Sequence, residues 1–170
     1  RHNKIDDLSL YNHFGAVERV PLEAMVSTAD DLVTPVKVKR FHGLMNSKTR
    51  QLLDVRPIGK TYALVNHGPV FEAQAKQLAA SDLPLDNVEV LDRVYDAGAR
   101  AHRTIIFHDL SKQTKNRTGK PDIVRCRMDI FNSVDMSWAF QIFSGAYRDL
   151  CRNTLVFGGE KAYHQRKIHK

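Results

Sequence analysis

The segment DIVRCRMDIF, residues 122 to 131, alternates apolar and charged side chains along most of its length. Successive side chains of a β-strand point to opposite faces of the sheet, so this pattern separates the two kinds of side chain. The apolar set is Val124, Cys126, Met128 and Ile130, and the charged set is Arg125, Arg127 and Asp129. The pattern predicts a sheet with one buried and one open face, which is typical of antiparallel sheets.

Several other stretches predict strands. In residues 36–56, two β-rich runs flank the turn residues NSKT, and in residues 87–110 two such runs flank DAGA, with Gly98 at the turn. Each pair of runs predicts a hairpin. The segments SWAFQIF and KAYHQRKIHK predict further strands, and the stretch between Leu110 and Ile123, which holds no apolar residue, predicts an exposed basic loop.

Two segments predict helices. In residues 69–81, apolar side chains and Gln74 recur at helical spacing and the pattern ends before Pro84. A shorter helix is expected over GAYRDLCRN, residues 145–153, because Tyr147 and Cys151 then share one side while Arg148 and Arg152 share another.

These elements together predict an α+β fold, with a largely antiparallel sheet of two hairpins plus further strands and one longer and one shorter helix packed on one face. We expect residues 1–30 to form an N-terminal arm or first strand, and residues 31–170 to form a single α+β domain with a basic C-terminal part. No apolar run approaches the length that a bilayer requires, so we expect a soluble intracellular protein without membrane contact.

The charge of the chain is distributed unevenly. Residues 1–99 carry 12 basic and 13 acidic side chains, a net charge of −1, whereas residues 100–170 carry 14 and 6, a net charge of +8. Such an excess favours a polyanionic partner, nucleic acid before membrane. The alternative is a solvated basic surface that keeps the protein soluble.

The segment NSVDMSWAFQIFSGAYRDLCRN, residues 132–153, combines aromatic residues with many hydrogen-bonding side chains. Buried polar groups need partners, so these side chains organise a polar network or face a ligand. We expect a structural network that pins the short helix to the sheet, formed by Asn132, Asp135, Arg148 and Asn153.

The same segment resembles a domain of unknown function, number 932, that occurs in phage and plasmid-like proteins. The matching positions are Asn132, Ser133, Asp135, Gly145, Arg148, Cys151 and Asn153, and Met136 stands where that pattern has a glycine. The stretch LLDVRPIGKTYALVNHGPVFE also resembles this family. The resemblance implies a phage or mobile-element setting in a bacterial cytoplasm, and a relation to phage single-strand annealing proteins.

A groove for single-stranded nucleic acid needs cations that follow the phosphates and aromatic faces for stacking. The candidate nucleic-acid-binding residues are Lys112, Lys115, Arg117, Lys120, Arg125, Arg127, Arg148, Arg152, Arg166 and Lys167. Tyr147 or Tyr163 are candidates for stacking. We expect the other large aromatic residues, Trp138 among them, to lie in the core.

Enzymatic readings have less support in the sequence. The eight histidines have no metal-ligand spacing, and the phosphate-binding glycine motifs are missing, so we expect no metal and no cofactor. Three aspartates, Asp109, Asp129 and Asp135, leave a metal-dependent nuclease open as an alternative. For Asp129 we expect instead a salt bridge with a neighbouring arginine.

The sequence therefore predicts a non-catalytic single-stranded DNA-binding protein that acts in strand annealing or homologous recombination. Its expected partners are single-stranded DNA and further copies of itself, in a homo-oligomer such as a ring that repeats the groove along the strand. A protein-interaction module with a basic face is the third alternative.

Overall fold

The computed structural model describes residues 15–27, 29–30, 32–115 and 118–148, together with the backbone of two short strands at 155–156 and 164–167. The described elements form two antiparallel sheets, of three and six strands. The smaller sheet has the order β1 (Val17–Ser27), β2 (Val33–Asn46) and β3 (Ile58–Gly59). The larger has the order β4 (Val88–Tyr95), β5 (Arg100–Lys115), β6 (Pro121–Ser133), β7 (Phe140–Arg148) and β8 (Leu155–Val156), and β9 (His164–Lys167) also pairs with β7.

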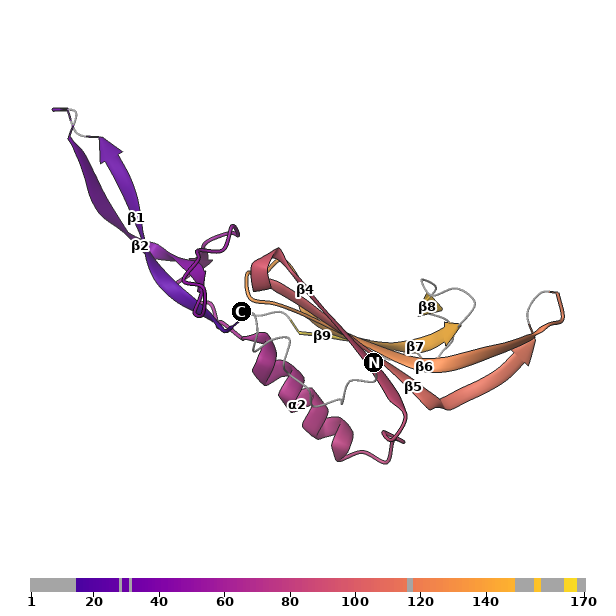
Figure 1. Ribbon diagram of the computed structural model, residues 1–170. Helices are drawn as coiled ribbons and strands as arrows, with labels where there is room; N and C mark the ends of the chain where they lie inside the picture. Colours follow the sequence, from indigo (N-terminus) through magenta and orange to yellow (C-terminus); the bar gives the residue numbers. More distant parts are fainter. Residues whose placement is uncertain are drawn as a thin grey trace.

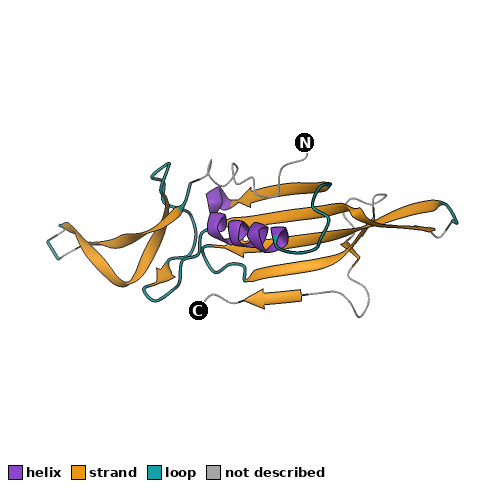
Figure 2. Ribbon diagram, turned by 90° about the horizontal axis from the view of Figure 1, so that it is seen from below, coloured by secondary structure: helices purple, strands orange, loops and turns teal. Residues whose placement is uncertain are grey.

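The molecule is elongated, as Figure 1 shows. The β1–β2 hairpin projects at one end and the β5–β6 hairpin at the other, and helix α2 (His67–Ala79) lies between them. Figure 2 shows α2 lying across one face of the larger sheet. We call the opposite face of this sheet the open face, because no helix of the described residues covers it.

The main core lies between α2 and the larger sheet. Phe71 and Leu78 of the helix pack against strand residues such as Val90, Ile105 and Ile130. The apolar side chains of β6 face this core, since Cys126 and Met128 also contact it. The predicted alternation of β6 and the predicted helix are thus confirmed. The helix buries Phe71, Gln74, Ala75 and Leu78 as expected, together with His67, whereas Val70 of the same predicted pattern is half-buried.

A buried ion pair lies within this core. Arg103 of β5 is fully buried and makes two parallel hydrogen bonds to Asp92 of β4, from Nε to Oδ1 and from Nη2 to Oδ2, both 2.9 Å. Its guanidinium also lies 5.0 Å from the centre of the Phe71 ring. The pair therefore joins two strands to the helix with a geometry that matches the fork of the arginine to the carboxylate.

A second, smaller core joins the two sheets. Val17, Leu44 and Ile58 of the smaller sheet pack with Ala99 and Val134 from loops of the larger sheet. The Asn66 side chain, just before α2, accepts a hydrogen bond from the Val17 amide (2.7 Å) and donates one to the Val17 carbonyl (3.1 Å). These contacts fix the base of the β1–β2 hairpin against the start of the helix.

The outer half of the β1–β2 hairpin is exposed on both faces. We call residues 21–36 the arm. Met25, Leu32 and Val33 are 67%, 64% and 55% exposed, and Val26 and Val36 are exposed as well. Large apolar side chains gathered on one protruding element are unusual on the surface of a monomer.

Three expectations from the sequence need correction. The expected short helix is wrong over residues 145–148, which belong to β7 and pair with Val124–Arg127 of β6. This pairing buries Tyr147 and satisfies the backbone groups in the sheet, which outweighs a local helical pattern. The remainder of that segment lies outside the described residues, in which α2 is the one α-helix.

The other two corrections concern hairpins. Strand β2 pairs with β1 and not with residues 50–56, which contribute the single bridge of Leu52 to Met45. The expected loop after Leu110 is largely strand, because β5 continues to Lys115 and β6 begins at Pro121. The antiparallel sheet and the hairpin of residues 87–110 are confirmed.

Candidate nucleic-acid interface

Strand β6 carries Arg125, Arg127 and Asp129 on the open face, opposite the core-facing Cys126, Met128 and Ile130. Directly paired residues of antiparallel strands share a face, so the register assigns the neighbours. The open face thus receives the following side chains from β4 to β7: Glu89, Leu91, Arg93, Tyr95, Arg100, His102, Thr104, Ile106, Ser111, Gln113, Lys115, Pro121, Ile123, Arg125, Arg127, Asp129, Phe131, Ser133, Gln141, Phe143 and Tyr147. In the middle of this face His102, Thr104, Ile106 and Asp129 are buried.

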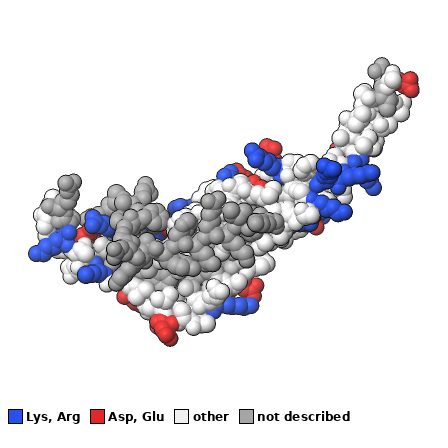
Figure 3. All heavy atoms as spheres, turned by 180° about the vertical axis from the view of Figure 1, so that it is seen from behind, with Lys and Arg blue, Asp and Glu red and all other residues white. Residues whose placement is uncertain are grey.

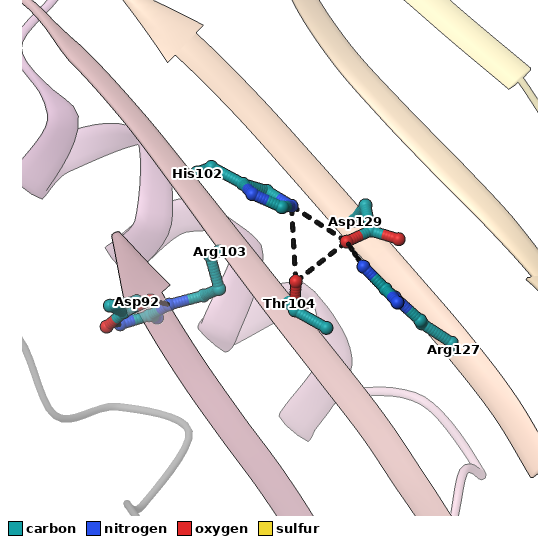
Figure 4. Close-up of polar contacts among 6 residues, drawn as sticks. All are labelled: Asp92, His102, Arg103, Thr104, Arg127 and Asp129. Carbon is teal, nitrogen blue, oxygen red and sulfur yellow. Dashed lines mark hydrogen bonds and ion pairs between the residues drawn. The ribbon is translucent and has the colours of Figure 1, made fainter. Parts of the chain in front are cut away.

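A polar cluster lies at the centre of the open face (Figure 4). One carboxylate oxygen, Asp129 Oδ1, accepts hydrogen bonds from His102 Nε2 (2.7 Å), Thr104 Oγ1 (2.7 Å) and Arg127 Nη2 (2.8 Å). The expected salt bridge of Asp129 with a neighbouring arginine is confirmed. All three donors come from β5 and β6, whose pairing places Thr104 opposite Asp129.

The electrostatics of this cluster indicate a structural role. Burial raises the pKa of Asp129, but the hydrogen bonds from His102, Arg127 and Thr104 together lower it by more, so the pKa lies below its ordinary value. Such a carboxylate is a weak base. The hydroxyl of Thr104 and the carboxylate both contact the same nitrogen of His102, so the imidazole does not bridge them as a proton relay does.

Arginine and aromatic side chains continue from this cluster toward the β5–β6 hairpin. The guanidinium of Arg127 lies 5.7 Å from the centre of the Tyr147 ring, and Arg125 stands opposite Tyr147 in the register. Tyr147 is only 8% exposed, so this ring supports Arg127 and has little surface for a base. Tyr163, the other expected stacking residue, lies outside the described residues.

The end of the β5–β6 hairpin carries exposed lysines. Lys112, Lys115 and Lys120 are all exposed. The β5–β6 register shifts between Phe107 and Ser111, so Lys115 shares the open face with Arg125 whereas Lys112 shares the other face with Val124. We call residues 111–125 the basic hairpin.

At the other end of the open face, four side chains form what we call the aromatic corner: Tyr95, Phe131, Trp138 and Arg100. The Trp138 ring meets Tyr95 and Phe131 edge to face at centroid distances of 5.6 and 5.7 Å, and the Arg100 guanidinium lies 5.1 Å from its centre. Trp138 is half-buried here and does not belong to either buried core cluster, which corrects the expected core position.

Hydrogen bonds fix the loop that presents Trp138. The Ser133 hydroxyl donates to the Trp138 carbonyl (2.8 Å) and accepts from its amide (3.0 Å), and Asp135 accepts from the Ser137 amide and hydroxyl. Met136 between them has a φ of +65°, a conformation that favours glycine.

The residues of the expected polar network lie apart. Asn132 donates from Nδ2 to Val65 O (3.3 Å) and to His67 Nδ1 (3.0 Å), and so fixes the start of α2. Asp135 orders the loop before Trp138. The Nε atom of Arg148 lies 3.6 Å from Oδ2 of the buried Asp122. The expected network around a short helix is therefore wrong, because β7 occupies that position; Asn153 lies outside the described residues.

Some of the residues predicted to contact nucleic acid lie outside the described part of the chain or have only their backbone described. Arg117 and Arg152 lie outside the described residues. Arg166 and Lys167 lie on β9, where the backbone pairs with Gln141 and Phe140 of β7. Of the ten expected nucleic-acid contacts, the open face receives Lys115, Arg125 and Arg127 among those whose side chains are described.

A second group of cations, at the base of the arm, was missed as a site. It comprises Arg19, Lys37, Lys39 and Arg40, all exposed. Figure 3 shows basic side chains gathered at the base of the arm and at the opposite end of the molecule. The alternation of β2 in the sequence indicated that Lys37 and Lys39 share a face. It did not indicate that β2 pairs with β1, which places Arg19 in the same part of the molecule.

His67 provides a pH-dependent contribution to stability. Its Nδ1 accepts a hydrogen bond from Asn132, so Nε2 carries the proton and donates to Gly98 O (2.8 Å). Burial lowers the pKa of His67 below its ordinary value of 6.5, although the Gly98 carbonyl and the Asp135 carboxylate raise it in part. Just below pH 6.5 this imidazole is therefore still largely neutral in the folded protein, whereas in the unfolded chain it takes up a proton.

We predict that this histidine makes the protein less stable as the pH falls below about 6.5, with a slope of at most about 1.4 kcal/mol per pH unit for one proton. Urea unfolding at pH 7.5 and 5.5 measures the loss. His67→Gln is the matched variant, and its stability should change less between the two pH values. An equal change in both proteins would assign the effect to other groups.

Among the described residues, no three histidine, cysteine, aspartate or glutamate side chains gather into a group that could hold a metal ion. The three aspartates of the nuclease alternative all lie in the described part, and they do not meet. Within that part of the chain, no helix has the length and apolar character needed to cross a membrane. Comparisons with family models, curated proteins and solved structures found no match to this chain.

Proposed function

We propose that this chain is a non-catalytic single-stranded DNA-binding protein of a phage or mobile element that acts in strand annealing or homologous recombination. One observation carries the proposal: cations and aromatic rings lie on the open face at both of its ends, the basic hairpin and the aromatic corner. Lys115, Arg125 and Arg127 form one group of cations, and Arg100 and Arg93 form the other. Single strands bind to such groups through phosphate contacts and base stacking.

The polar cluster contributes by fixing Arg127. Asp129 and Tyr147 hold Arg127 between them, so this guanidinium has little side-chain entropy to lose when a phosphate binds. The Arg127 side chain is 15% exposed and its charge is paired with Asp129, so its guanidinium offers a phosphate only a small surface. Because no metal-binding group is formed by the described residues, a nuclease is the weaker alternative.

The proposal is tested by fluorescence anisotropy of labelled single-stranded DNA, single-stranded RNA and duplex DNA across a salt series, with magnesium and with chelator. We expect tighter binding of the single strand, a steep loss of affinity with salt, and no need for magnesium. A gel of the same samples detects cleavage. Cleavage that requires magnesium would favour the nuclease, and absence of binding to every oligonucleotide would refute the proposal.

The working form in this proposal is a homo-oligomer such as a ring, and the arm supports it. The arm contains three acidic residues, Glu23, Asp30 and Asp31, and no lysine or arginine, whereas the rest of the chain has a large basic excess. An acidic, apolar element on a basic protein is complementary in charge to a second copy of the same chain. A contact between unlike surfaces repeats from copy to copy and closes into a ring where the rotation allows.

We predict that Met25→Ser with Val33→Thr weakens self-association at least about 10-fold, because two exposed side chains lose roughly 1.5 kcal/mol or more of burial each. The two residues lie on one face of the arm. Sedimentation velocity over a concentration series measures the change. Leu83→Ser removes an exposed apolar side chain outside the arm and should leave association unchanged. A monomeric wild type, or unaffected association in the double variant, would exclude the arm as the contact.

A further inference from the structure

We propose that the aromatic corner is a stacking site for a nucleobase of the bound strand, with Arg93 and Arg100 beside it for the neighbouring phosphates. The inference rests on the proposed function and names the part of the open face that recognises bases. It assigns a ligand-binding role to Tyr95 and Trp138, whose sequence positions had indicated a strand end and a core.

The first support is the exposure of the rings. Tyr95 is 38% exposed at the end of β4, and Leu91, four residues earlier on the same face, is 39% exposed. Trp138 and Phe131 are half-buried beside Tyr95. By contrast, the ring of Phe71 from α2, which packs against the opposite face of the sheet, is fully buried. The aromatic corner therefore keeps apolar surface in water, which a base could cover.

The second support is the rigidity of the corner. Two hydrogen bonds with Ser133 fix the backbone of Trp138, and the Tyr95 and Phe131 rings fix its side chain from two sides. Phe131 is itself stacked on His102, with ring centres 4.2 Å apart and planes within 9° of parallel. A base that stacks here therefore meets rings that are already ordered, and less conformational entropy is lost on binding.

The third support is the charge around the rings. Arg93 is exposed and lies opposite His102, one alternation from Tyr95 on the same face. Arg100 lies opposite Tyr95, forms an ion pair with Asp96 and stands near the Trp138 ring. Arg127 and Arg125 lie further along the same face, beyond the buried pair of Thr104 and Asp129. A ligand that fits this surface has aromatic rings and regularly spaced negative charges, as a single strand does.

Trp138 is the only tryptophan of the chain, so its fluorescence reports on this corner alone. We expect quenching when a thymidine oligonucleotide binds, with the same midpoint as the anisotropy titration. The control ligand is an abasic deoxyribose-phosphate oligomer of equal length, which keeps the phosphates. It should bind more weakly and leave the fluorescence nearly unchanged, because quenching requires a stacked base.

Tyr95→Ala tests the ring itself, and Tyr95→Phe is the matched control. We expect Tyr95→Ala to weaken binding of the thymidine oligomer about 10-fold and binding of the abasic oligomer by less than twofold, and Tyr95→Phe to behave as wild type. Thermal unfolding verifies that both variants fold. Binding without base-dependent quenching, or equal effects of Tyr95→Ala on the two oligomers, would overturn this inference alone. Absence of binding to both oligomers would overturn the proposed function with it.

Discussion

Replacing Lys115 and Lys120 together with alanine is expected to weaken binding of single-stranded DNA about 25-fold near 0.1 M salt, and by progressively less as salt approaches about 1 M. Each lysine that contacts a phosphate releases about 0.7 of a counterion from a single strand, so two contacts change the slope of log affinity against log salt by about 1.4. Both lysines are exposed; Lys115 lies on the open face and Lys120 in the turn before β6.

The measurement is anisotropy at four or more salt concentrations with wild type and variant. The matched control removes two exposed lysines elsewhere, Lys48 and Lys60, so that the two variants have the same net charge. A control variant that loses as much affinity and slope would show that overall charge, and not the basic hairpin, determines binding. An unchanged slope in the hairpin variant would place the phosphate path elsewhere.

Arg103→Met is expected to destabilise the protein by about 3–5 kcal/mol, because it leaves the Asp92 carboxylate buried without its partner. Arg103 is fully buried and Asp92 nearly so, hence water cannot replace the lost hydrogen bonds. Urea unfolding measures the change. The variant also removes the guanidinium from the Phe71 ring, so contact between the sheet and α2 weakens at the same point.

Two controls distinguish the effect of leaving Asp92 unpaired from the effect of replacing an arginine by methionine. Arg93→Met alters an exposed arginine of the adjacent strand β4 and should change stability by less than about 0.5 kcal/mol. The double variant Asp92→Leu with Arg103→Met removes both charges and should recover most of the loss. A double variant as unstable as Arg103→Met would mean that packing, and not the unpaired carboxylate, causes the effect.

Local patterns predicted the elements whose stability is local. The helical spacing around Phe71 and the alternation of β6 each describe one face of one element, and both faces are buried as expected. The hairpin of residues 87–110 was also predicted correctly, because a short turn joins two runs that are adjacent in the sequence. Register and face assignments within such elements could therefore be read from the sequence.

Long-range pairing could not be predicted in this way. Residues 145–148 have a helical pattern but lie in β7, because β6 offers a strand edge that satisfies their backbone groups. Strand β2 pairs with β1, which the pattern of residues 36–56 alone could not indicate. The polar cluster is a similar case, since the contact of His102 with Asp129 joins residues 27 positions apart.

The aromatic corner depends on both kinds of information. Trp138 was expected in the core because large aromatic residues are usually buried. Its position was instead determined by the loop after β6, where Ser133 and Asp135 hold the backbone, and by the end of β4, where Tyr95 lies. The unusual density of polar residues in the segment 132–153 was the available signal, and three of them order this loop or the start of α2.

The central claim is that single-stranded DNA lies along the open face of the larger sheet. The most direct measurement is photocrosslinking of an oligonucleotide that carries 5-iodouridine, followed by mass-spectrometric mapping of the crosslinked peptides. We expect crosslinks to peptides that contain Tyr95, Trp138 and the basic hairpin, and their loss when unlabelled single strand is added. Crosslinks confined to α2 or to the arm would place the strand on another surface and contradict the claim.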